Sequence, residues 1–175
     1  MKKCLESLAK KLNFTLEYKG IYQRPHLYGT YKNNAFLIYF KRKANTLIVT
    51  TPLEIKTQCV LAISPKTFIV RLTEKIFGST KTCNKEFDNK FSLYCDSEDV
   101  VKYILTPDVL NSMLEFNNIE LYIEYPAQDN ITCEIPFKIA WRFSEITDFI
   151  SGIDFKSLFN IMCTISEGVT AYKNN

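Results

Sequence analysis

The sequence contains one histidine and only five glycines, and each scarcity excludes a class of chemistry. A Ser-His-Asp or Cys-His mechanism would have to use His26, which stands in "RPHLYG". No serine or cysteine lies in a nucleophile signature that could partner this histidine. P-loop and dinucleotide fingerprints, which depend on glycine, are also absent. We therefore interpret His26 as a surface or half-buried residue.

Long apolar runs and clustered cysteines are missing as well. No apolar run approaches the ~18 residues of a membrane span, and the opening "MKKCLESLAKKLNF" carries Glu6 and several lysines where a signal peptide would be apolar. We therefore expect a cytoplasmic protein. None of the six cysteines forms a C-x-x-C pair, so we expect reduced, buried thiols, no metal site and no cofactor.

The composition is that of a globular protein. Apolar residues make up 46% of the 175 residues and charged residues 23%. A chain of this length can bury one large core but not two ordinary ones, so we expect a single domain over residues 1–175. The net charge of +3 is too small to indicate a nucleic-acid partner, and any such surface would have to be local.

Apolar periodicity predicts an α+β fold. Helical spacing indicates a helix over residues 2–12, a pair of short helices joined at Thr106 and Pro107, and a long helix over 154–169. Alternation indicates a strand near 14–18, four more strands between 24 and 65, and a hairpin over 119–139, whereas 67–78 fits either helix or strand. We expect a mainly antiparallel sheet, a meander followed by the C-terminal hairpin, with the N-terminal, central paired and C-terminal helices packed on it.

Five carboxylates are concentrated in the stretch "CNKEFDNKFSLYCDSEDVVKYILTP". They are Glu86, Asp88, Asp96, Glu98 and Asp99. Asp96 and Ser97 precede a predicted helix, where they can accept free amide hydrogens, and Asp99 suits an approximate capping box with Asp96. Capping alone does not explain Asp88, unless it fastens a short helix or turn before Phe91. Glu86 and Asp88 share one side only in an extended segment, and a metal-assisted hydrolase using both is one hypothesis.

A basic cluster follows two aromatic residues in "YFKRKAN". Lys41, Arg42 and Lys43 come directly after Tyr39 and Phe40. Cations beside aromatic rings are typical of single-stranded nucleic-acid binding, with charge for phosphates and rings for bases. The alternative is a lysine-rich hairpin end that keeps a sheet edge soluble. In either case these three residues are the candidate nucleic-acid or partner surface.

The stretch from Thr82 to Pro107 resembles an uncharacterised bacterial family of unknown function, in which a T-G-D-x-x-F-D-x-x-F motif precedes a strand, an acidic turn, a short helix and an L-T-P-like junction. Residues that match this pattern are Thr82, Phe87, Asp88, Phe91, Asp96, Thr106 and Pro107. Cys83 and Asn84 stand where the motif has Gly and Asp. The resemblance implies an α+β domain, with Phe87 as a buried ring and Asp88 as a carboxylate that fixes the turn.

The sequence therefore predicts a non-enzymatic protein-interaction or regulatory module. No combination of nucleophile, base and electrophile can be assembled from the motifs present. Nucleic-acid binding through Lys41, Arg42 and Lys43 is the first alternative, and a metal-assisted hydrolase using Glu86 and Asp88 is the second. We expect the partner to be another protein.

Overall fold

The computed structural model describes residues 2–18, 25–41, 46–53, 60–67, 70, 79–123, 130–136 and 148–173. Its strands are β1 (Thr15–Tyr18), β2 (Pro25–Tyr31), β3 (Asn34–Lys41), β4 (Thr46–Pro52), β5 (Leu61–Pro65), β6 (Phe91–Cys95), β7 (Glu120–Ile123) and β8 (Asn130–Pro136). Its helices are α1 (Lys2–Leu12), α3 (Lys85–Lys90), α4 (Glu98–Ile104), α5 (Pro107–Leu114) and α7 (Phe155–Lys173).

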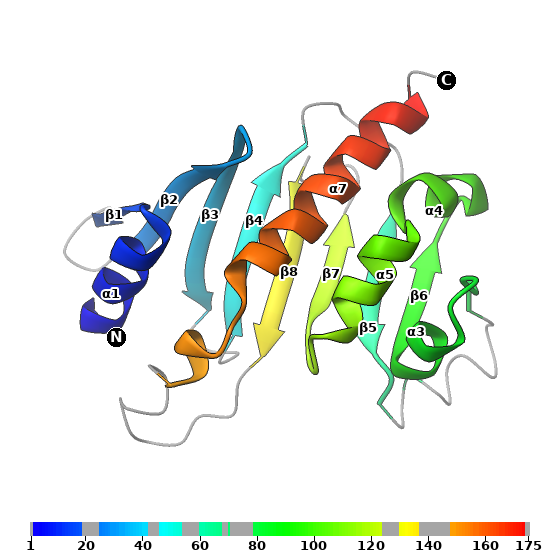
Figure 1. Cartoon of the computed structure of the whole chain (residues 1–175), viewed down its shortest axis with the longest axis horizontal. Coiled ribbons are helices and arrows are strands. Elements are labelled where there is room, and N and C mark those ends of the chain that lie inside the picture. Colours follow the sequence, from blue (N-terminus) through cyan, green and yellow to red (C-terminus); the bar gives the residue numbers. More distant parts are fainter. Residues whose placement is uncertain are drawn as a thin grey trace.

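The strands form one antiparallel sheet in the order β1-β2-β3-β4-β8-β7-β5-β6. The labelled helices all lie against the same face of this sheet, and α7 crosses it diagonally (Figure 1). This arrangement is the α+β fold that the sequence predicts. Within the described part of the chain, no helix is both long enough and apolar enough to cross a membrane.

The predicted meander covers only the first four strands. β4 pairs with β8 from Thr46↔Pro136 to Pro52↔Asn130, and β5 instead lies between β7 and β6. Leu47, Ile48 and Val49 of β4 are all buried, so this strand needs neighbours on both edges and cover on both faces. Alternation reveals which residues share a face but not which strands pair, and the position of β8 is therefore invisible in the sequence.

The C-terminal hairpin is confirmed, although residues 124–129 between its strands lie outside the described part of the chain. β7 and β8 pair antiparallel, with Leu121 opposite Cys133 and Ile123 opposite Ile131. Residues 67–78, whose structure the sequence leaves ambiguous, lie almost entirely outside the described residues.

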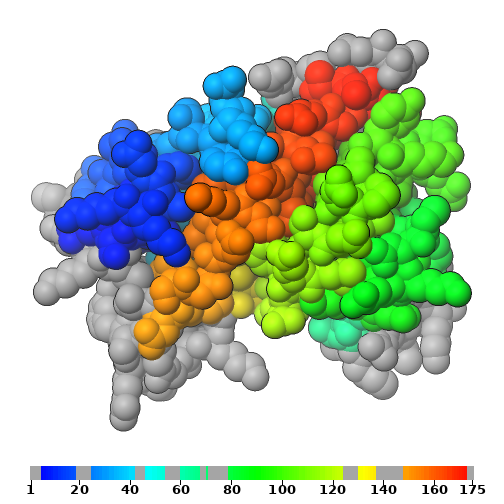
Figure 2. All heavy atoms as spheres, in the orientation of Figure 1, coloured from blue at the N-terminus to red at the C-terminus, as the bar shows by residue number. Residues whose placement is uncertain are grey.

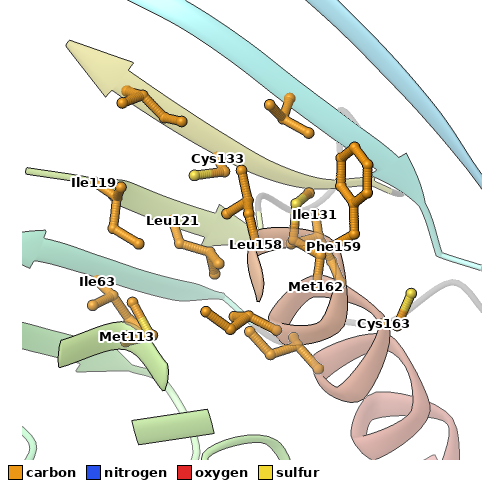
Figure 3. Packing of buried hydrophobic residues seen from close by; sticks show 14 of the residues in the cluster. Ile63, Met113, Ile119, Leu121, Ile131, Cys133, Leu158, Phe159, Met162 and Cys163 are labelled. Atoms are coloured by element: carbon orange, nitrogen blue, oxygen red, sulfur yellow. The ribbon is translucent and has the colours of Figure 1, made fainter. Parts of the chain in front are cut away.

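The core fills the space between the sheet and α7. Leu158, Phe159 and Met162 project from one side of α7 towards the sheet (Figure 3). These three side chains are at most 1% exposed, and the Phe159 ring packs against Phe36 of β3 with centroids 4.4 Å apart. Their spacing along the chain is the helical periodicity that predicts this element.

A glycine allows α7 to pass close to α4. A Cβ built at Gly168 would lie 2.5 Å from the backbone oxygen of Tyr103, a distance too short for any side chain. The close approach therefore depends on the missing side chain of Gly168.

The four described cysteine side chains are free thiols. Cys133 and Cys163 are buried, Cys95 is half-buried and Cys83 is exposed. The expectation of buried thiols is therefore wrong for Cys83, which lies in the bend before α3 rather than in an apolar stretch.

Candidate interaction site

Asp88 fastens the segment that leads into α3. Its two carboxylate oxygens accept hydrogen bonds from the Thr82 amide at 3.1 and 3.2 Å, and one of them also accepts from the Thr82 hydroxyl at 3.0 Å. Asn84 caps α3 by accepting from the amides of Glu86 and Phe87. The Asp88 side chain is therefore engaged in holding a turn before a short helix.

A metal-assisted hydrolase that uses Glu86 and Asp88 would need further ligands beside these two carboxylates. Glu86 is exposed on α3, while Asp88 is turned to Thr82. Among the described residues, no group of three His, Cys, Asp or Glu side chains lies close enough together to hold a metal ion. The geometry therefore favours a structural role for Asp88, and also for the Phe87 and Phe91 rings, which are at most 1% exposed and have centroids 5.2 Å apart.

The acidic turn before α4 differs from the capping box that the sequence predicts. Ser97 is the N-cap and accepts from the Val100 amide at 3.5 Å. The Asp96 carboxylate instead accepts from the Val60 amide at 3.1 Å, which extends the pairing of β5 with β6 beyond Cys95. Asp99 forms an exposed ion pair with Lys102.

Thr106 and Pro107 join α4 to α5. The Thr106 hydroxyl accepts from the Val109 amide at 3.4 Å, and Pro107 is the first residue of α5. Proline fits this position because the first amide of a helix has no partner within it.

Lys41 lies at the end of β3, on the sheet face opposite α7. Its ammonium is 3.3 Å from Glu134 Oε1, and the Tyr122 hydroxyl donates to the same oxygen at 2.9 Å. Burial, and secondarily the charge of Glu134, raises the pKa of Tyr39 beside this pair. Arg42 and Lys43 lie outside the described residues. The charge of Lys41 is therefore partly compensated by a neighbouring carboxylate.

His26 lies on the same sheet face as Lys41. Its ring centroid is 5.4 Å from that of Tyr39, and the Tyr28 hydroxyl is 3.3 Å from His26 Nδ1. At the centre of this face Ile48 is 3% exposed and Thr132 is 4% exposed, so the centre is not open to solvent. The structure thus brings His26 and Lys41 to one polar and aromatic surface around Tyr39.

A cleft lies where α5, β8 and the turn before α7 meet. The sequence alone does not predict it. It has a volume of about 400 Å³. The apolar residues lining it come from three separate segments: Phe116, Ile119, Ile135, Phe149 and Ile153. The orange residues before α7 and the lime-green end of α5 border the yellow end of β8 in Figure 2.

Three carboxylates line the same cleft, and we call the whole feature the acid-rimmed cleft. Asp154 accepts from the amides of Lys156 and Ser157 and so caps the start of α7, while Glu115 accepts from the Ser157 hydroxyl at 3.5 Å. The exposed carboxylate of Asp148 forms no hydrogen bond or ion pair with any described residue. None of the described residues that line the cleft is a lysine or an arginine. The described part of the lining therefore combines apolar surface with three carboxylates.

The architecture defines a class before any comparison: an α+β fold built on one open antiparallel sheet, with the described helices on a single face. The chain belongs to the family described as protein of unknown function (DUF3137), which matches residues 34–125, more than half of its length. The resemblance to an uncharacterised family is thereby supported, while the motif proposed for that family stays a prediction. No curated protein matches the chain.

The fold recurs in a solved structure. The crystal structure of the mycobacterial trehalose monomycolate transport factor A, TtfA, is similar with a TM-score of 0.56 over 95% of this chain and 93% of that one. The two sequences are 10% identical, so the likeness concerns the fold alone.

Proposed function

We propose that this protein is a non-enzymatic protein-interaction module and that a partner binds in the acid-rimmed cleft. The observation that carries the proposal is the combination of apolar lining with Glu115, Asp148 and Asp154, and with no basic residue among the described lining residues, in a chain whose net charge is +3. A negative concave surface on a slightly basic protein selects its partner by charge, because such a patch repels acidic segments and attracts basic ones.

The chemistry of the lining indicates what the partner carries. Phe116 and Phe149 are half-buried rings that present apolar surface to the cleft, which suits one aliphatic or aromatic side chain. The Asp148 carboxylate, which has no partner among the described residues, suits a lysine or arginine next to that side chain, because charge-assisted hydrogen bonds are stronger than neutral ones. The partner is thus a segment in which a large apolar residue stands beside a basic residue.

Nucleic-acid binding at Lys41, Arg42 and Lys43 is less well supported. Lys41 is paired with Glu134, and Glu120 lies directly across from Glu134 on the neighbouring strand. Two carboxylates beside the described cation weaken the attraction of this surface for phosphates.

A peptide selection with a built-in control tests the proposal. Gly152 lines the cleft, and a Cβ there would be 3.5 Å from its nearest neighbours, so Gly152→Trp can fill the cleft without disturbing the backbone. A random peptide library is first depleted of peptides that bind the Gly152→Trp variant, and the remaining peptides are then selected for binding to the native protein. We expect enriched peptides with a large apolar residue next to Lys or Arg. Acidic peptides, or no enrichment beyond the depleted pool, would contradict the proposal.

A further inference from the structure

A second cavity lies on the other side of α7, where the β2–β3 turn faces the C-terminal half of this helix. It has a volume of about 380 Å³ and is lined by the turn residues Lys32, Asn33 and Asn34 and by Ser166, Glu167 and Thr170 of α7. The blue turn lies next to the red end of α7 in Figure 2. Hydrogen bonds connect the turn to the helix: the Tyr31 hydroxyl donates to Asn160 at 3.0 Å, the Asn34 side-chain amide donates to Cys163 Sγ at 3.3 Å, and the Cys163 thiol donates to the Tyr31 carbonyl oxygen at 3.9 Å.

Ser166 is the feature of this cavity that packing alone does not explain. The residue is only 4% exposed, yet its hydroxyl forms no hydrogen bond within the described part of the chain. A serine within a helix commonly bonds back to a carbonyl one turn earlier, as Thr170 does to Ser166 at 3.0 Å. A buried hydroxyl without a partner is unfavourable. A polar group that enters the cavity and forms a hydrogen bond with it therefore gains more binding free energy than it would at an exposed site.

The described lining of the cavity also includes one cation and one anion. Lys32 and Glu167 both line it, and neither forms an ion pair with another described residue. The Lys32 ammonium lies 5.9 Å from the centroid of the Tyr31 ring, at the turn end of the cavity, and Glu167 is on α7. The side-chain amide of Asn33 adds donors and an acceptor to the lining, whereas Asn34 adds only its Oδ1, because its Nδ2 donates to the Lys32 carbonyl oxygen and to Cys163 Sγ.

We infer that this cavity binds a small zwitterion of the free amino-acid type. The ligand carboxylate would pair with Lys32 and its ammonium with Glu167, while Ser166 would hydrogen-bond to one of these groups. The volume is at the lower end of the range for small-molecule sites and suits a ligand of amino-acid size. The site is separate from the acid-rimmed cleft, with which it shares no lining residue.

Calorimetry and protein NMR with the twenty free amino acids, each at millimolar concentration, test the inference. Each amino acid is paired with its N-acetyl form, which lacks the ammonium, and its amide, which lacks the carboxylate; glucose serves as a neutral polar probe. We expect at least one free amino acid to bind, both modified forms to bind at least ~10-fold more weakly, and shifts at Asn34 and Ser166.

Variants assign the binding to the cavity. Lys32→Gln and Glu167→Gln should each weaken binding by about tenfold, and Ser166→Ala by several-fold. Lys10→Gln, Glu17→Gln and Gly152→Trp should leave it unchanged, since Lys10 and Glu17 are exposed and distant from the cavity residues in the sequence and Gly152 lines the cleft instead. The inference is overturned if no amino acid binds, if the modified forms or glucose bind equally well, or if both charge variants retain full affinity.

Discussion

The carboxylate of Asp88 accepts hydrogen bonds from both the backbone amide and the side-chain hydroxyl of Thr82, six residues earlier in the chain. This one interaction connects the loop before α3 to the helix itself. The same helix places Phe87 in the core with no exposed surface. Asp88 therefore stabilises the position of a buried aromatic residue as well as its own turn.

Asp88→Ala should lower the melting temperature by several degrees. The substitution leaves the Thr82 amide without its acceptor and removes one of the two acceptors of the Thr82 hydroxyl, a loss of about 1–3 kcal/mol. Glu86→Ala is the matched control, because this acid is exposed on the same helix. Thermal unfolding followed by circular dichroism measures both variants. Equal melting curves for Asp88→Ala and the native protein would contradict the structural role.

Gly168→Ala should destabilise the protein and loosen the contact between α4 and α7. The new methyl group would lie 2.5 Å from the Tyr103 carbonyl oxygen, so one helix must move, at a cost of about 1–3 kcal/mol. Gly152→Ala is the control, since its methyl would have ordinary contacts at 3.5 Å. Urea unfolding gives the free energy of unfolding of both variants. A Gly168→Ala protein as stable as the native protein would show that the contact between α4 and α7 can accommodate a methyl group.

Cys133 should make stability depend on pH in the alkaline range. Burial raises the pKa of this thiol well above its usual range, with smaller contributions from Glu134 and Glu120. The unfolded chain therefore loses the proton first, so the stability from Cys133 is complete below pH ~8.5 and declines as the pH rises further. Unfolding midpoints between neutral and alkaline pH should fall less steeply for Cys133→Ala than for the native protein. The same pH dependence of the unfolding midpoint in Cys133→Ala and in the native protein would refute this effect.

Thiol exposure gives a second, independent test of the same packing. Cys83 is exposed and should react readily with iodoacetamide under native conditions, whereas buried Cys133 should react only after unfolding. Mass spectrometry of alkylated peptides distinguishes the two sites. Rapid native labelling of Cys133 would show that the sheet beneath α7 opens.

Local patterns account for much of the fold. The periodicity of α7, the Thr106-Pro107 junction and the alternation of β7 and β8 depend on residues close together in the sequence, and each can be read there. The insertion of β8 beside β4 depends on a pairing between residues 78 to 90 positions apart, which no local pattern specifies.

The candidate sites were harder to predict for the same reason. Asp148 and Asp154 precede α7, whereas Glu115 follows α5, and only the folded chain brings them to one cleft. Lys41 could be singled out as basic, but its partner Glu134 is on a strand far along the chain. The Ser166 hydroxyl gives no signal in the sequence, because its lack of a partner is a property of packing.

The most direct test of the proposed interaction is the affinity of the best selected peptide for three proteins. Fluorescence anisotropy should give similar dissociation constants for the native protein and Gly152→Ala, and binding to Gly152→Trp at least ~10-fold weaker, since the indole occupies the apolar part of the cleft. Asp148→Lys should also weaken binding, whereas Glu17→Lys, with the same charge change at an exposed position on β1, should not. Equal affinity for native protein and Gly152→Trp would show that the partner binds elsewhere.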